Sequence, residues 1–454
     1  MQTMTDKRES DRLSNGFLPQ APLLNDRATA VGIWDMDTPD AVCYGQAPLQ
    51  PLDKLVLARL HGDPLLMLHL PAEQRELSTD FMFQAVWEQG AAAVRRHIER
   101  CGCLNALDSA ADLRTAAEKL PVACPGHEPI RPEGKVAVVI CTVGRQQALE
   151  RCLSSLARLR FDEYEVIVVD NRPAVPGTRE VVERFRTRLR IRYVAEPAIG
   201  SSAARNAGIE AAADVRYLAF IDDDVVVDEY WLERIIAPFT DEAIAAVTGL
   251  VLPLTLASAV QKRFELYAGF GKGVEPELYD MGAYRASDRF LYPYFGGVFG
   301  SGNSMAFRRE ALEAIGRFNL AFGPGTPTQS AEDIVAFTDV VLSGGRLCYE
   351  PKAVCWHEHR DDEEALMAQA RGYGIGLTAA FWHYLWTDPR FVMTVIRSAP
   401  LTLAILNKRG RQRQSEEVPV QIIKADAQGR LLGPWRYSLS RLKLMRQGRA
   451  GRRK

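Results

Sequence analysis

The chain lacks the features that mark a membrane-spanning or secreted protein. No uninterrupted apolar run has transmembrane length, and the longest candidate, residues 391–406, is interrupted by Arg397 and Pro400. Residues 1–15 mix acidic and basic side chains without an apolar stretch, so they do not resemble a signal peptide. The 8 cysteines include no CxxC pair, which disfavours a zinc site. Together these absences predict a protein of the reducing cytosol.

Two phosphate-binding signatures are absent as well. GxGxxG does not occur where a predicted strand turns into a helix, and the chain contains no GxxxxGK[ST]. Dinucleotide sites and P-loop chemistry are therefore disfavoured. With 454 residues, 47% of them hydrophobic and 25% charged, the chain is typical of a globular protein of two or three domains.

Basic and acidic residues nearly balance over the whole chain, but basic residues are concentrated at one end. The net charge is −1, yet residues 408–454 hold 14 lysines and arginines against 3 carboxylates. This basic end predicts an anionic partner, such as a lipid surface at the inner face of a membrane. A solvated tail is the alternative. Nucleic acid is not an expected partner, because no aromatic interleaving or known binding motif accompanies the charge.

Changes in composition divide the chain into regions. Two apolar runs around His61-Gly62-Asp63 predict a hairpin, and helical spacing follows over residues 78–99. Residues 252–300 are rich in glycine and tyrosine, which is typical of a functional loop region. The predicted regions are a disordered lead at 1–25, a small α+β domain at 26–120, a proline-rich linker at 121–133, an α/β domain at 134–365, and a helical region with a basic tail at 366–454.

From residue 135 onward, predicted strands and helices alternate at short spacing. This order predicts a mostly parallel sheet with helices on both faces. The strands are expected at 135–141, 164–170, 191–195 and 217–221, and the helices between them at 146–159, 178–189 and 201–212.

The fourth strand ends in three consecutive acids, Asp222, Asp223 and Asp224. Adjacent carboxylates at the tip of a buried strand repel one another and lose solvation, so a cation, a sugar or a phosphate-bearing ligand is expected to offset the repulsion. An exposed acidic turn is the alternative.

Polar side chains lie near the ends of the neighbouring strands as well. Thr142 and Arg145 follow the first strand, Asp170 ends the second, and Arg205 precedes the fourth. Because the carboxyl ends of parallel strands meet at one edge of the sheet, these groups should converge with the acids. The set suits a nucleotide whose diphosphate is bridged by a divalent cation.

Seven short segments resemble the inverting family 2 glycosyltransferases of the GT-A fold. They occur in that family's order over about half of the chain, and the flanking regions are not covered. The resemblance implies a GT-A sheet and transfer of a sugar from a nucleoside-diphosphate sugar to an acceptor hydroxyl, with inversion. The segments are residues 138–145, 168–171, 200–208, 220–225, 300–303, 332–333 and 356–357.

The resemblance also implies which residues bind the donor. Asp170 would read the base of the nucleotide, Asp223 would hold the ribose, and Arg205 would approach the base or the phosphates. UDP is the commonest donor nucleotide in such families, with GDP and TDP as alternatives. The implied donor-binding residues are Thr142, Arg145, Asp170, Arg205, Asp222, Asp223, Gly302 and Asn303.

The remaining implied roles concern the metal and the base. Asp224 and His357 would bind Mn²⁺ or Mg²⁺ at the diphosphate, with His359 as the alternative to His357. Asp333 would be the general base that deprotonates the acceptor hydroxyl, supported by Glu332. A base must not be a metal ligand, because coordination would occupy its lone pairs. Taken alone, the acid pair is better explained as acids at a helix N-terminus, and both histidines are equally well explained as surface residues.

Two positions depart from the family pattern. Asn171 stands where a small residue usually follows the base-reading acid, and Ala331 stands where glycine usually precedes the acid pair. Two other functions are kept as alternatives. A nucleotidyltransferase would need a glycine-rich loop resembling GxGxR, which residues 142–145 match poorly. A non-catalytic scaffold that binds nucleotide sugars at a membrane surface would not need a base.

Overall fold

The computed structural model forms two compact units. One unit contains Met1–Pro129, Leu252–Glu275 and Glu358–Asp361, and the other contains Ile130–Val251, Pro276–His357 and Asp362–Lys454. The predicted lead and the end of the basic tail lie outside the described residues, apart from a few positions near residue 20. The described residues are 18–19, 23, 27–37, 42–44, 53–74, 77–101, 107–119, 131–286, 291–397 and 418–448.

The first unit is a small sheet covered by helices, as the α+β prediction for this region expects. In the sheet, β3 lies between a parallel β1 and an antiparallel β4. His61 and Gly62 connect β3 to β4, and both have a positive φ (54° and 75°), which suits a two-residue hairpin turn. The predicted hairpin is confirmed. The elements are β1 (Thr29–Asp35), β2 (Cys43–Tyr44), β3 (Asp53–Leu60), β4 (Asp63–Leu70), α3 (Thr79–Cys101) and α4 (Ala110–Lys119).

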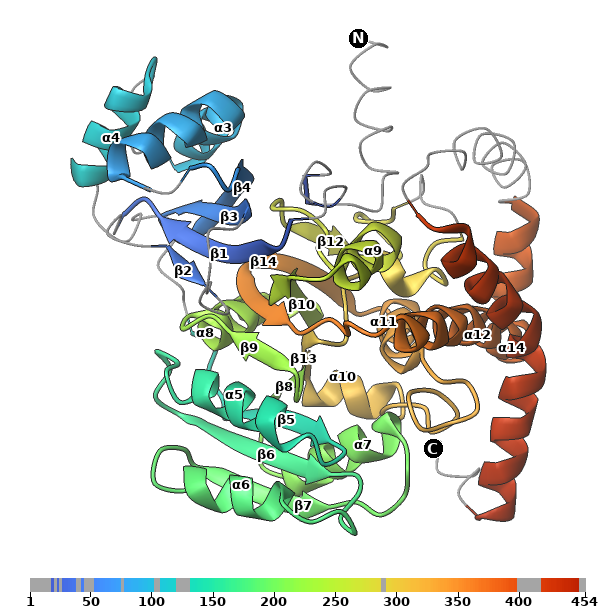
Figure 1. Cartoon of the computed structure of the whole chain (residues 1–454). Coiled ribbons are helices and arrows are strands. Elements are labelled where there is room, and N and C mark those ends of the chain that lie inside the picture. Colours follow the sequence, from blue (N-terminus) through green and yellow to red (C-terminus); the bar gives the residue numbers. More distant parts are fainter. Residues whose placement is uncertain are drawn as a thin grey trace. The chain divides into compact units, whose positions relative to one another are not determined.

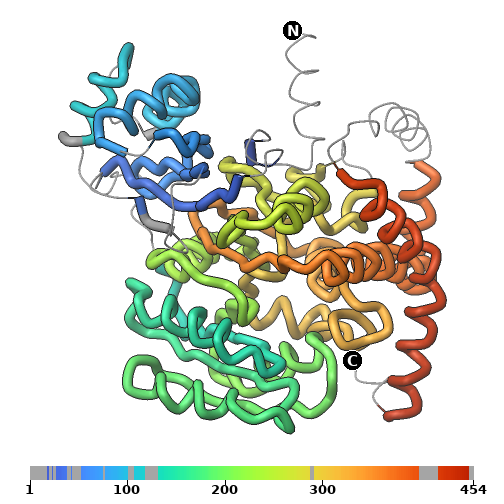
Figure 2. Tube along the Cα trace, viewed as in Figure 1, coloured from blue at the N-terminus to red at the C-terminus, as the bar shows by residue number. Residues whose placement is uncertain are grey.

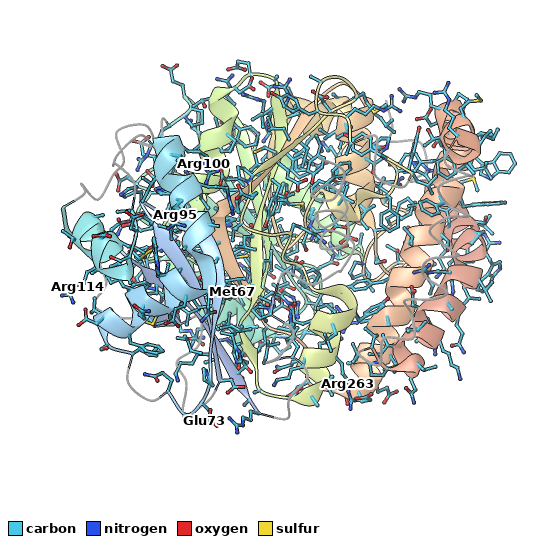
Figure 3. All side chains as sticks on the ribbon, turned by 90° about the horizontal axis from the view of Figure 1, so that it is seen from above. Met67, Glu73, Arg95, Arg100, Arg114 and Arg263 are labelled. Atoms are coloured by element: carbon cyan, nitrogen blue, oxygen red, sulfur yellow. The ribbon has the colours of Figure 1, made fainter. Side chains whose placement is uncertain are left out.

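The helices of this unit are held by aromatic and basic side chains. Trp34 of β1 meets Phe83 of α3 edge to face, with ring centroids 5.1 Å apart. The Arg95 guanidinium lies 4.9 Å from the centre of the Trp87 ring, and its Nε donates to the carbonyl of Leu107 at 3.2 Å. Arg95 therefore links α3 to the segment that leads into α4 (Figure 3).

The prediction of a loop region over residues 252–300 is wrong for its first part. Residues 255–256 form β11, which pairs with β1, and Ala259–Ala268 form the helix α9. Ser258 and Gln261 make a capping box that begins this helix. The box supplies partners for backbone N–H groups at the helix start, so a helix forms within a glycine-rich region.

The second unit contains an α/β sheet, which confirms the predicted fold class. Its strands follow the order β12-β14-β10-β13-β8-β5-β6-β7, and β9 pairs with β14. β7, β6, β5 and β8 are parallel as predicted, whereas β13 is antiparallel to β8, so the sheet is mixed (Figure 1). The elements of the parallel half are β5 (Val136–Thr142), α5 (Gln146–Leu156), β6 (Tyr164–Asp170), α6 (Thr178–Phe185), β7 (Ile191–Ala195), α7 (Ser201–Ala211) and β8 (Tyr217–Asp222).

The order of the parallel strands creates a switch point. The chain proceeds outward from β5 to β6 and β7, then returns to form β8 on the other side of β5. Because parallel crossovers are right-handed, α7 covers the face of the sheet opposite to α5 and α6. Ligands of open α/β sheets bind where the strand order reverses, which here is between the carboxyl ends of β5 and β8.

The rest of the second unit extends the sheet and adds helices. Two 3₁₀ turns and a short helix, α10, connect its strands. β9 pairs in antiparallel fashion with the end of β14. The elements are β9 (Val225–Val227), α8 (Trp231–Ile236), β10 (Ile244–Pro253), β12 (Glu277–Tyr279), β13 (Ser304–Arg308), α10 (Arg309–Ala314), α11 (Glu332–Leu342), β14 (Arg346–His357), α12 (Glu363–Thr387) and α14 (Val420–Arg446).

The predicted helical C-terminal region is confirmed in its described part. The two long helices α12 and α14 pack side by side (Figures 1 and 2). Their backbones approach closely where glycines face the partner helix. A Cβ atom built on Gly429 would lie 2.0 Å from the carbonyl oxygen of Arg371, and one built on Gly433 would lie 2.0 Å from the Thr378 Oγ1.

We expect Gly429→Ala to lower the free energy of unfolding by about 2 kcal/mol, because the methyl group has no space unless the helices separate. Urea denaturation of the full chain would measure the change. Gly297→Ala is the matched control, because a Cβ atom there meets nothing within 4 Å. Equal stability of the two variants would contradict the close packing of α12 and α14.

Candidate active site

The polar ends of β5 and β8 meet at the switch point of the sheet. Asp223 is fully buried, and its Oδ2 accepts a hydrogen bond from the Thr142 Oγ1 at 2.6 Å. Arg145 donates to the same oxygen from its Nε at 3.2 Å and also forms an ion pair with Asp224 at 2.5 Å. The structure therefore brings Thr142 and Arg145 together with the acids, as the sequence predicts.

The acids of this cluster differ in how readily they ionise. Burial raises the pKa of Asp222 to about 7, although Arg205 opposes the rise. Burial likewise raises the pKa of Asp223 to about 6 against the influence of Arg145. For Asp224, burial alone would raise the pKa, but His357 and Arg145 together lower it below its usual value. Asp224 is thus the member of the triplet whose charged form the structure favours most.

His357 is brought to Asp224 by strand pairing. β9 directly follows the acid triplet and pairs with the end of β14, so that Val225 lies opposite His357. As a result, the His357 Nε2 lies 3.5 Å from the Asp224 Oδ1, an oxygen that accepts no hydrogen bond among the described residues. His359, the alternative to His357, is instead paired with Glu265, whose Oε1 lies 2.5 Å from its Nε2.

Arg205 connects the acid triplet to the acid pair of α11. Its Nη1 donates to the Glu332 Oε1 at 2.6 Å, and its Nη2 donates to the Asp222 Oδ1 at 3.2 Å. Ser201 also donates to the Glu332 Oε1, at 2.9 Å. Burial raises the pKa of Glu332, with Arg205 opposing the rise and Asp333 adding to it. In the structure Arg205 thus bonds to two carboxylates, whereas the sequence analysis predicts that it contacts the base or the phosphates of a nucleotide.

Asp333 lies at the start of α11, and two backbone N–H groups orient its carboxylate. Its Oδ2 accepts from the backbone N–H of Gly302 at 2.8 Å, and its Oδ1 accepts from that of Ile334 at 2.8 Å. A Cβ atom at Gly302 would lie 2.8 Å from the Asp333 Oδ2, so only glycine permits this approach. Ala331, the departure before the acid pair, has a φ of 75°, which explains why glycine suits that position.

Asn303 and Asp170 are both buried near strand ends. The Asn303 Oδ1 accepts from Ser301 at 3.1 Å, while its Nδ2 has no partner among the described residues. The Asp170 carboxylate accepts from the Tyr193 hydroxyl at 2.9 Å and from the backbone N–H of Arg172 at 3.0 Å. Tyr193 is a neighbour that the sequence interpretation misses, because it depends on the pairing of β6 with β7.

Asn171 has a structural role that the sequence gives no sign of. Its Nδ2 donates to the carbonyls of Glu196 and Ala198 at 2.9 and 2.8 Å, and its Oδ1 accepts from the backbone N–H of Gly200 at 2.9 Å. These bonds hold the turn between β7 and α7. The departure from the family pattern at this position therefore fixes the start of the helix that carries Arg205.

Two negative findings apply to the described part of the chain. No group of three or more histidine, cysteine, aspartate or glutamate side chains there is arranged to hold a metal ion. Among the same residues, none of the helices combines the length and the apolar character that crossing a bilayer requires.

Residues 137–316 match the family model described as glycosyl transferase family 2. A pre-mycofactocin glycosyltransferase of Mycobacterium tuberculosis is 27% identical over 318 residues, which cover 70% of this chain and 58% of that protein. The succinoglycan biosynthesis protein ExoM of Rhizobium meliloti is 29% identical over 242 residues, 51% of this chain and 69% of that protein. The chain thus spans less than two thirds of the first of these relatives.

The chain also resembles a solved structure at low identity. The mannosyltransferase PcManGT from Pyrobaculum calidifontis, in complex with GDP-Man and Mn²⁺, superposes with a TM-score of 0.46 at 15% identity. The superposition covers 78% of this chain and 98% of that one.

We expect Asn171→Ala to destabilise the second unit by about 2 kcal/mol, because it removes three hydrogen bonds and leaves buried backbone groups without partners. Urea denaturation is again the measurement. Arg172→Ala is the control, since its side chain is exposed and only its backbone N–H contacts Asp170. If the two variants unfold at the same urea concentration, Asn171 does not hold the turn.

Proposed function

We propose, because residues 137–316 match the model of glycosyl transferase family 2, that this protein is a metal-dependent, inverting glycosyltransferase. It would transfer a sugar from a nucleoside-diphosphate sugar to an acceptor hydroxyl. The observation that carries the proposal is the bridge made by Arg205. By bonding to Asp222 and Glu332, it ties the acidic end of β8, where we propose that the metal binds, to the start of α11, where the proposed base lies.

The donor would bind at the switch point of the sheet. Asp170, to which the Tyr193 hydroxyl donates, would read the base of the nucleotide, and Asp223 would hold the ribose. Thr142 and Arg145 would line the same pocket from the end of β5. Of the donor nucleotides, UDP is proposed first, with GDP and TDP as alternatives.

Asp224 and His357 fit a divalent cation. The Asp224 Oδ1 is buried, accepts no hydrogen bond among the described residues and faces the His357 Nε2 at 3.5 Å. One carboxylate and one imidazole leave the other ligand positions to the oxygens of the donor diphosphate, which agrees with the lack of a three-residue protein cluster. Bound Mn²⁺ or Mg²⁺ would neutralise charge on the departing diphosphate.

Asp333 would be the base. Its two backbone hydrogen bonds fix the orientation of the carboxylate. Asp333 would take the proton of the acceptor hydroxyl while that oxygen forms a bond to C1 of the sugar. The bond from C1 to the diphosphate breaks on the opposite face, which inverts the configuration at C1. Glu332 acts by holding Arg205 and so supports the arrangement.

We expect Asp224→Asn to abolish the metal dependence of donor binding. The thermal stability of the wild type should rise with one of UDP, GDP and TDP when Mn²⁺ is present, by about 2.7 kcal/mol at 100 times the dissociation constant. The variant should lose this rise, and Asp214→Asn, a change at an exposed acid, should keep it. A wild type that responds to none of the nucleotides would contradict the proposal.

We expect Asp333→Asn to leave donor binding unchanged and to slow turnover by about 10²- to 10⁴-fold, the usual contribution of a general base. Release of the nucleoside diphosphate from the donor sugar measures turnover, and calorimetry measures donor binding. Equal turnover in the wild type and the variant would exclude Asp333 as the base. A wild type that binds the donor but never releases the sugar would favour the non-catalytic scaffold.

A further inference from the structure

The helix α14 has two faces of different character. The buried face includes Gly429 and Gly433, where the backbone approaches α12 closely, together with Ile422, Tyr437 and Ser440. The Ser440 Oγ donates to the carbonyl of Ala321 at 2.9 Å, and the Tyr437 hydroxyl lies 2.8 Å from the His383 Nδ1. These contacts fix the rotation of α14, so its other face is held toward solvent.

Large apolar side chains lie on that outer face. Leu431 is 85% exposed, Trp435 58%, Leu442 41% and Met445 56%. Their spacing of four, seven and three residues places them on one stripe of the helix. A single exposed leucine is ordinary, but a stripe along one helix face is not expected of a surface that meets only water.

A second exposed apolar segment lies next to the same core. Residues 389–397 are helical, and Phe391 is buried in a cluster that also contains Tyr437 of α14. The neighbouring side chains point outward: Trp386 is 71% exposed and Ile396 is 60% exposed. We call residues 385–397, which include the end of α12, together with the outer stripe of α14 the apolar face. Its exposed members are Leu385, Trp386, Val392, Met393, Val395, Ile396, Leu431, Trp435, Leu442 and Met445.

The charged side chains of α14 are almost all positive. Val420–Arg446 contains one carboxylate, Asp426, which is buried and paired with Arg430 at 2.6 Å. Among the described residues, no carboxylate pairs with the basic side chains of the outer half of this helix. These are Lys424, Arg441, Lys443 and Arg446. A helix with exposed tryptophan and leucine on one face and unpaired basic groups at its flanks matches an interfacial helix of a peripheral membrane protein.

We propose that the apolar face docks on the surface of a lipid bilayer that contains anionic lipids. The aromatic and aliphatic side chains would enter the boundary between headgroups and acyl chains, while the basic side chains would contact the lipid phosphates. A second copy of this chain is the weaker partner, because two faces of positive charge repel each other. The proposal concerns α14 and residues 385–397, and it does not rest on sugar transfer.

The inner contacts of α12 and α14 connect the apolar face to the proposed active site. The Ser440 bond ends at Ala321, and the Ser330 Oγ donates to the carbonyl of Gly372 in α12 at 2.9 Å. The loop between these two positions leads directly into the acid pair of α11. A bilayer bound to the outer side would therefore orient the active site relative to the membrane plane.

Flotation of the full chain with lipid vesicles tests the proposal. We expect the wild type to float with vesicles of phosphatidylcholine and phosphatidylglycerol but not with phosphatidylcholine alone, and added salt should weaken binding. The double variant Leu431→Gln/Trp435→Gln should bind vesicles about tenfold more weakly or worse. Each substitution removes the favourable free energy of moving an apolar side chain from water into the lipid. Arg441→Glu/Lys443→Glu should lose binding to the anionic vesicles.

Matched variants control for a general change of surface. Val175→Gln/Ile199→Gln removes exposed apolar side chains elsewhere in the second unit, and Arg188→Glu/Arg190→Glu makes the same change in charge. Both should float like the wild type, and unfolding curves should show that all variants are folded. The proposal is overturned if the wild type ignores anionic vesicles, if the test and control variants bind alike, or if light scattering shows a dimer that Leu431→Gln/Trp435→Gln dissociates.

Discussion

The burial of carboxylates at the end of β8 is the constraint on which the active-site region depends. Asp222 and Asp223 lose solvation there, and Glu332 is buried beside them, so the folded chain must supply positive charge from within. Arg145 and Arg205 supply it, one from the turn after β5 and the other from α7. Removing either guanidinium would leave buried carboxylates uncompensated. The arginines therefore serve the fold as well as the chemistry we propose.

This arrangement leaves one carboxylate poised differently from its neighbours. The pKa values of Asp222 and Asp223 are raised, whereas that of Asp224 is lowered by His357 and Arg145 despite its burial. Asp224, which lies opposite the His357 imidazole, is therefore the carboxylate that we propose as a metal ligand. Asp333 is separated from that pair by the bridge through Arg205 and Glu332 and is held by backbone N–H groups instead. In the proposed function, metal binding and proton abstraction would therefore fall to different carboxylates.

The C-terminal helices divide their surface in a similar way. Glycines on the inner side let the backbones of α12 and α14 come into contact. The pairing of these two helices therefore depends on the absence of side chains at those positions. Tryptophan, leucine and methionine lie on the outer side, where such packing is impossible. The buried side keeps Ile422 and Tyr437 as well as the glycines, so the large apolar residues on the exposed side are additional to those that pack inward. The outer face is therefore explained better by a partner than by the stability of the chain itself.

The sequence by itself determined the alternation of strands and helices from residue 135, the hairpin at His61 and the residues that line the ends of β5 and β8. These follow from local periodicity and from the rule that parallel strands end together. Only the tertiary structure decided that His357 rather than His359 faces Asp224, because this depends on the pairing of β9 with β14. It also decided that Arg205 bonds to two carboxylates, that Asn171 holds a distant turn, and that a capping box forms α9 in a predicted loop. Most of these outcomes depend on contacts between residues far apart in the sequence. The helix α9 depends instead on a capping box, which forms although the surrounding composition is typical of a loop. The periodicity of hydrophobic residues reveals neither kind of interaction.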